Sequence, residues 1–195
     1  MEKKKLLFLD SCVRGKETSR TLELCQYFID ELGDKYEVIH LDLANMELKG
    51  MDKKVLEERD TLLKAGQRNH PFFDLSRQFA QADLILVGAP YWDWSFPAVL
   101  KAYVEKISVD GITFGYKDDK CVGLCKMEKV MYICTAGGYI EGRHLGVEYI
   151  KDIFLRYGAN EFYDVTAEGI DIFGNPVDEI LSEAKEKICK IARNF

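Results

Sequence analysis

The sequence has no long apolar run and no excess of positive charge. No stretch approaches the roughly 20 apolar residues that a membrane-spanning helix needs, and the short run Leu6–Leu9 cannot form the core of a signal peptide. Lysine and arginine number 27 against 33 acidic residues, for a net charge of −6. Such a chain lacks the basic face that nucleic acid binding requires. We therefore expect a cytoplasmic protein that binds neither nucleic acid nor a membrane.

Linkers and repeats are also absent from the sequence. Only four prolines occur in 195 residues, and no Gly/Ser/Pro-rich or low-complexity tract divides the chain. A chain of this length can bury one substantial core, and its apolar content of 47% is ordinary for a globular protein. We expect residues 1–195 to form a single domain.

The cysteine pattern does not indicate a metal site. Cys25, Cys134 and Cys189 fall in apolar patterns, where reduced cysteine behaves as a small hydrophobe. Cys121 and Cys125 are separated by three residues, without a second pair or nearby histidines to complete a zinc site. We expect free thiols and no bound metal, with a disulfide or metal role for this pair as the alternative.

Apolar runs alternate with amphipathic segments along most of the chain. Short, nearly continuous apolar runs are typical of strands buried on both faces of a parallel sheet, and the segments between them follow helical spacing. The pattern predicts strands at 5–10, 37–41, 83–88, 129–135 and 161–166, and helices at 19–33, 52–66, 72–82, 97–108, 144–157 and 176–192. Residues 110–126 form an excursion with a turn at 117–120. The fold class is therefore α/β, a doubly wound five-stranded parallel sheet with helices on both faces.

Ligands of open α/β sheets bind beyond the carboxyl ends of the strands, which directs attention to three loops. The first, residues 11–20, supplies hydroxyls, cations and the amides of a helix N-terminus, the elements of an anion site. We place Thr18 and Ser19 against a phosphate, with Ser11 and Arg20 as additional candidate donors. Either Thr18 or Ser19 could equally serve only as a helix cap. Because the loop lacks both the dinucleotide fingerprint and the P-loop pattern, a monophosphate fits best.

The second loop, residues 89–97, holds both tryptophans of the chain between two prolines. The prolines restrict the backbone, and the aromatic side chains offer surface on which a flat ligand can lie. For Phe96 a place in the core is the better interpretation. For Trp92 and Trp94 we favour contact with a ligand or with a second subunit.

The third loop, residues 135–143, begins Thr135-Ala136-Gly137-Gly138 after a buried strand. Paired glycines allow a close backbone approach that side chains would block, although they are often only a turn. Tyr139 could close over a ligand or lie on the surface. Tyr139 and His144 are the candidate proton donors, and for His144 a place at the start of a helix is the alternative.

Together these segments resemble the flavodoxin-like NAD(P)H:quinone oxidoreductases and FMN-dependent NADH azoreductases. The resemblance rests on Asp10-Ser11 with Thr18-Ser19, on APYWDWSFPAVLK at 89–101, on GITFGY at 111–116 and on TAGG at 135–138. Asp93 stands where azoreductases commonly have asparagine. The similarity in order and spacing spans roughly residues 5–160.

The resemblance implies one flavodoxin-like domain over residues 1–195 that binds FMN and takes hydride from NADH or NADPH. It also implies a homodimer that reduces quinones, azo compounds or similar small acceptors by two-step hydride transfer. By the same resemblance, the FMN phosphate or ribityl chain would be bound by Ser11, Thr18 and Ser19. The flat ring would be lined by Pro90, Tyr91, Trp92, Asp93 and Trp94, and its other edge by Thr135, Gly137, Gly138 and Tyr139.

Two other functions are compatible with the same fold. A flavodoxin-type electron carrier would serve protein partners and need no hydride donor, but such carriers have a Thr-x-Thr-Gly-x-Thr phosphate loop that this sequence lacks. A regulatory module without flavin is the second alternative.

Overall fold

A parallel sheet of five strands in the order β2-β1-β3-β6-β7 forms the centre of the structure, a computed structural model that describes residues 3–195. Buried apolar runs form its inner strands, since the residues of β3 are all buried. The strands are β1 (Lys4–Asp10), β2 (Tyr36–Asp42), β3 (Leu84–Gly88), β6 (Lys129–Thr135) and β7 (Glu161–Ala167). The five-stranded parallel sheet predicted from the sequence is confirmed, and each predicted strand lies within two residues of the observed one.

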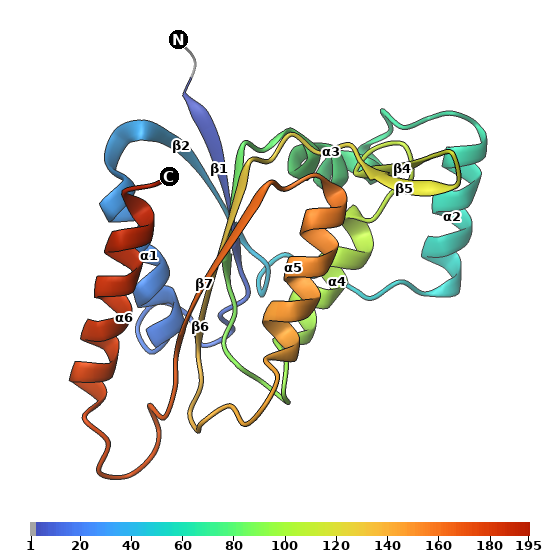
Figure 1. Ribbon diagram of the computed structural model, residues 1–195. Helices are drawn as coiled ribbons and strands as arrows, with labels where there is room; N and C mark the ends of the chain where they lie inside the picture. The colour runs from blue at the N-terminus through green and yellow to red at the C-terminus, as the bar shows by residue number, and fades with distance from the viewer. Residues whose placement is uncertain (1–2) are drawn as a thin grey trace.

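Helices cover both faces of this sheet (Figure 1). Successive side chains of a strand point to opposite faces, so Leu6 and Phe8 pack against α1 and α6 while Leu7 and Leu9 pack on the side of α3, α4 and α5. The helices are α1 (Arg20–Leu32), α2 (Lys53–Lys64), α3 (Asp74–Gln81), α4 (Ala98–Ile107), α5 (Leu145–Tyr157) and α6 (Val177–Ala192), with short 3₁₀ turns at Gly33–Lys35 and Pro71–Phe73.

Side-chain caps mark where the helices begin within the predicted segments. The hydroxyl oxygen of Ser19 accepts a hydrogen bond from the amide of Leu22 at the start of α1, and the ring of His144 does the same for Val147 at the start of α5. The helix predicted at 72–82 begins only at Asp74, because Pro71 opens a separate 3₁₀ turn.

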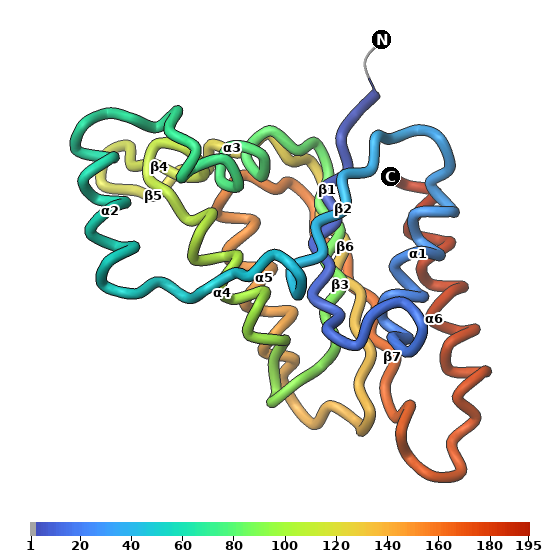
Figure 2. The backbone as a smooth tube through the Cα atoms, turned by 180° about the vertical axis from the view of Figure 1, so that it is seen from behind, coloured from blue at the N-terminus to red at the C-terminus, as the bar shows by residue number. Residues whose placement is uncertain are grey.

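The excursion predicted at 110–126 contains a β-hairpin of β4 (Phe114–Lys117) and β5 (Lys120–Gly123). Its turn residues Asp118 and Asp119 both have positive φ, 50° and 60°, as a two-residue hairpin turn requires. The hairpin packs on the end of α5, where the amide of Cys125 donates to the carbonyl of Tyr157 at 3.0 Å. Figures 1 and 2 show both α2 and this hairpin at the end of the molecule away from α1 and α6.

The carboxyl ends of the parallel strands meet at one edge of the sheet, the lower edge in Figure 1. The loops that follow β1, β3, β6 and β7 therefore lie together at this edge. Within residues 3–195, no helix is both long enough and apolar enough to cross a membrane.

Candidate functional site

A cleft of about 280 Å³ opens at the carboxyl edge of the sheet. Residues from all three predicted loops line it, together with a fourth segment that follows β7. The lining residues are Cys12, Val13, Arg14, Thr18, Ser19, Arg20, Thr21, Pro90, Tyr91, Trp92, Thr135, Gly137, Ile170 and Asp171.

The first loop brings the N-terminus of α1 to the cleft. Ser19 caps the helix, with its hydroxyl oxygen 3.2 Å from the amide nitrogen of Leu22. The amides of Arg20 and Thr21 belong to the first turn and have no acceptor inside the helix. Because the positive end of the helix dipole lies here, and Arg14 lines the same cleft, this end of the cleft suits an anion.

The second loop forms the aromatic wall. Pro90, Tyr91 and Trp92 line the cleft. The amide of Tyr91 donates a hydrogen bond to the carbonyl of Thr135 at 2.9 Å. Beyond them the chain turns back tightly, since the amide of Ser95 donates to the carbonyl of Trp92 at 2.8 Å. This wall is therefore tied to the third loop by a backbone hydrogen bond.

Asp93 and Trp94 occupy the tip of that turn with φ of 49° and 61°. Aspartate and asparagine tolerate this left-handed region, but tryptophan has no such preference. The Trp94 side chain is 71% exposed, so little packing offsets the backbone strain. Strain of this kind is typical of sites kept for function.

Replacing Trp94 by glycine is expected to stabilise the free protein by about 0.5–1 kcal/mol, because glycine adopts a positive φ without cost. This net gain allows for the opposing effect of glycine, which raises the conformational entropy of the unfolded chain. Thermal unfolding would measure the change, with Asp93→Asn as a control that keeps the turn. Unchanged or reduced stability of the glycine variant would contradict the assignment of strain to Trp94.

The third loop closes the floor of the cleft. The hydroxyl of Thr135, the last residue of β6, lies 2.7 Å from that of Thr21 in α1, and both side chains are buried. Gly137 lies two residues further along the chain, and a Cβ atom there would lie 2.6 Å from Oδ2 of Asp171. A larger residue at this position would require the side chain of Asp171 to turn away.

The segment after β7 completes the site, and the sequence reasoning missed it. The amides of Ile170 and Asp171 donate to the carbonyls of Ala136 and Gly137 at 3.2 and 2.9 Å. Asp171 also forms an ion pair with Arg20 at 2.9 Å. The signal was available, because the fifth strand ends at the same edge as the others.

Eight of the predicted site residues come together in the cleft: Thr18, Ser19, Arg20, Pro90, Tyr91, Trp92, Thr135 and Gly137. Missed were Cys12, Val13, Arg14 and Thr21, besides Ile170 and Asp171. Cys12 is almost fully buried, and burial raises the pKa of its thiol, which therefore stays protonated. All six cysteines are free thiols.

Six predicted residues lie outside the lining of the cleft. Ser11 is buried and donates its hydroxyl to the carbonyl of Gly88 at 2.8 Å. Tyr139 is 64% exposed, and its hydroxyl accepts a hydrogen bond from Asn175 at 3.1 Å. The others are Asp93, Trp94, Gly138 and His144.

His144 lies behind the aromatic wall. Its ring contacts that of Tyr91 edge-on, with the centroids 5.1 Å apart. Burial lowers the pKa of His144 and outweighs the nearby carboxylates, which favour the cation. The side chain is therefore neutral at neutral pH.

Comparisons with known proteins agree with this architecture. The model of a family described as having a flavodoxin-like fold matches residues 4–192. An FMN-dependent NADH:quinone oxidoreductase of Clostridium beijerinckii is 36% identical over 98% of this chain and 99% of its own. A second oxidoreductase of that name, from Clostridium acetobutylicum, is 34% identical over the same shares.

The fold also matches a solved enzyme structure. The crystal structure of an azoreductase from Bacillus anthracis aligns with a TM-score of 0.86 at 25% identity, and the alignment covers 98% of this chain and 100% of that one. The chain therefore belongs to the flavodoxin-like family that includes the FMN-dependent NADH:quinone oxidoreductases.

Proposed function

We propose that this protein is an FMN-dependent oxidoreductase that uses NADH to reduce quinones, azo compounds or similar small acceptors. The observation that carries the proposal is the composition of a single cleft, in which an anion site and an aromatic wall lie together. The relatives named as FMN-dependent NADH:quinone oxidoreductases support it, as does the azoreductase of similar fold.

The donor set fits the phosphate of FMN. Arg14, Thr18 and Ser19 line the cleft beside the first turn of α1. The hydroxyl of Thr18 donates to the carbonyl of Arg14 at 3.0 Å, whereas that of Ser19 only accepts, from the amide of Leu22, and can still donate to a ligand. We assign the phosphate to these groups, since a helix N-terminus favours a negative charge. Arg20 is held by Asp171, so we assign it the role of fixing the rim.

The opposite part of the cleft fits a planar ring. Pro90, Tyr91 and Trp92 present apolar surface, and Ile170 adds an aliphatic side chain from the segment after β7. Thr135 and Gly137 lie where backbone and hydroxyl groups could meet the polar edge of the ring. FMN, when bound, supplies the hydride chemistry, and these residues orient it and exclude water from one of its faces.

The proposal includes the homodimer and the cytoplasmic location that the sequence led us to expect. Trp94 and Tyr139 are exposed beside the cleft, and we propose that they, with Asp93 and Gly138, contact the bound substrate or a second subunit. Sedimentation of the purified protein with and without FMN tests the dimer, and fractionation of the source cells tests the location.

An absorption spectrum of the purified protein, followed by anaerobic titration with NADH, tests the function. We expect a flavin spectrum, bleaching by NADH, and recovery of colour on addition of a quinone or an azo dye. A colourless protein that does not bind added FMN would refute the proposal. Bound FMN that NADH cannot bleach would favour the electron carrier instead, and titration with NADPH measures the preference for the donor.

A further inference from the structure

His144 links the start of α5 to the aromatic wall of the cleft. It precedes Leu145, the first residue of α5, and its Nδ1 accepts a hydrogen bond from the amide of Val147 at 3.2 Å. A neutral imidazole carries one proton, so this acceptor role places the proton on Nε2. The ring is thus fixed in one tautomer by the helix that it caps.

The proton-bearing nitrogen does not face the cleft. Nε2 of His144 is buried and has no hydrogen-bond partner within residues 3–195, and His144 is not among the residues that line the cleft. A group in this position cannot deliver a proton to a substrate without a movement of the loop. Its role must therefore come from what its ring touches.

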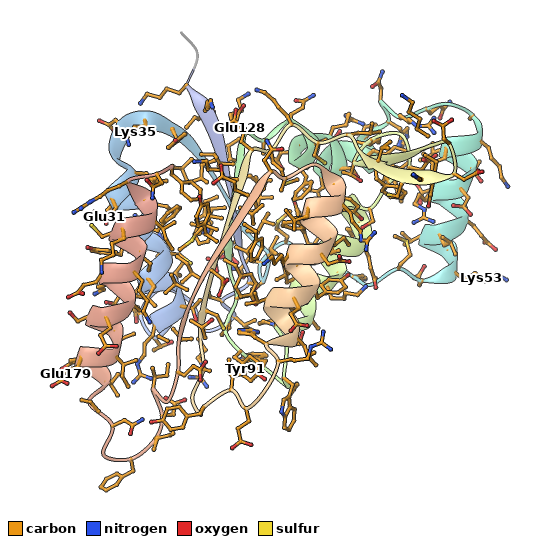
Figure 3. The ribbon with its side chains drawn as sticks, in the orientation of Figure 1. Glu31, Lys35, Lys53, Tyr91, Glu128 and Glu179 are labelled. Carbon is orange, nitrogen blue, oxygen red and sulfur yellow. The ribbon has the colours of Figure 1, made fainter. Side chains whose placement is uncertain are left out.

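Two tyrosine rings pack against the imidazole. The ring of Tyr91 lies at 5.1 Å and 82° and that of Tyr132 at 6.0 Å and 89°, both edge-to-face. This arrangement is the attractive one for aromatic rings. Tyr132 belongs to β6 and is fully buried, whereas Tyr91 lines the cleft. Figure 3 labels Tyr91, which lies at the lower end of the sheet near the start of α5.

We propose that His144 is a positioning residue whose neutral ring holds Tyr91 in place and so prepares the aromatic wall for a planar cofactor. This inference rests on the proposed function for the identity of the ligand. The contact between the two rings itself does not depend on it.

Protonation of His144 would undo this arrangement. The cation has no acceptor at Nδ1 for the amide of Val147, and its charge would lie at the positive end of α5. The carboxylates of Glu148 in α5, Asp164 in β7 and Glu168 after β7 favour the cation, but burial opposes it more strongly and lowers the pKa. The unfolded chain therefore binds this proton more readily than the folded one, so the free energy of unfolding falls as the pH drops below about 6.5. In the folded protein the ring becomes charged only at a lower pH, and the wall should loosen there.

The test uses His144→Asn, because asparagine is a good helix cap but lacks the ring. We expect the variant to bind FMN about threefold more weakly than the wild type at pH 7.5, and to melt at a slightly lower temperature because both ring contacts are lost. We also expect the wild type to lose affinity between pH 7 and pH 5 more steeply than the variant does. Flavin fluorescence quenching measures both effects.

Tyr91→Leu and the double variant complete the design. If His144 acts through Tyr91, His144→Asn should have no further effect on FMN binding in the Tyr91→Leu background. Equal losses in both backgrounds, or an unchanged affinity and pH profile of His144→Asn, would overturn the inference. Should the wild type bind no FMN, the proposed function fails, and thermal unfolding of the same four proteins still measures the coupling between the two side chains.

Discussion

Gly123→Ala is expected to lower the free energy of unfolding by about 3 kcal/mol, at the upper end of the range for overpacked sites. A Cβ atom at Gly123 would lie 2.5 Å from the amide nitrogen of Gly158 and would also overlap the carbonyl group of Tyr157. Both contacts are with backbone, which no side-chain rotation can relieve. The hairpin must therefore move away from the end of α5, and the hydrogen bond between Cys125 and Tyr157 would be strained with it.

Gly115→Ala is the matched control, because Gly115 lies in β4 of the same hairpin and a Cβ there would meet only Cδ1 of Leu124, at 3.5 Å. We expect its stability to stay within about 0.5 kcal/mol of the wild type. Thermal unfolding measures both variants, and the Gly123 substitution should lower the melting temperature by about 9 °C for a domain of this size. Equal melting temperatures of the two variants would show that the hairpin is not packed on α5 as described.

The inner strands were predictable because their side chains are buried on both faces. Leu84–Gly88 and Lys129–Thr135 appear in the sequence as apolar runs, and their hydrophobic burial holds them in the sheet. The strands of the hairpin are different. Phe114–Lys117 and Lys120–Gly123 are short and largely exposed, so their sequence carried a turn signal but no burial pattern.

The candidate site was predictable at the level of loops and less so at the level of side chains. Topology alone directs three loops to one edge of the sheet, and eight of the predicted residues line the cleft. The direction of a side chain depends on distant partners. Ser11 turns inward because the carbonyl of Gly88, 77 residues away, accepts its hydroxyl hydrogen, and no local pattern encodes such a pairing.

The same limit applies to the segment after β7. Its residues Gly169, Ile170 and Asp171 have no composition typical of a binding loop, and their place is set by hydrogen bonds to the carbonyls of Gly138, Ala136 and Gly137. The carbonyls of Gly137 and Gly138 accept hydrogen bonds from this segment, and only the structure shows that the Gly-Gly pair has this role.

Gly137→Ala should weaken FMN binding about tenfold, a loss of about 1.4 kcal/mol. The added Cβ would lie 2.6 Å from Oδ2 and 3.3 Å from Cβ of Asp171. The Asp171 side chain would have to turn away, which separates it from Arg20, and its backbone would move by a few tenths of an ångström. Since Arg20 and Asp171 both line the cleft, the displacement should reach the bound cofactor more than the core.

Gly138→Ala distinguishes this effect from a general cost of replacing glycine in the loop. Its added Cβ has no atom within 4 Å and its φ is not positive, so its stability should match the wild type and its loss of affinity should be smaller than that of Gly137→Ala. Titration of the three apoproteins with FMN measures the difference, and a variant Asp171→Ala combined with Gly137→Ala should recover part of the affinity, since the smaller side chain removes the close contact with Oδ2. If Gly137→Ala and Gly138→Ala bind FMN equally well, the segment after β7 does not position the cofactor, because only the substitution at Gly137 brings a Cβ atom against Asp171.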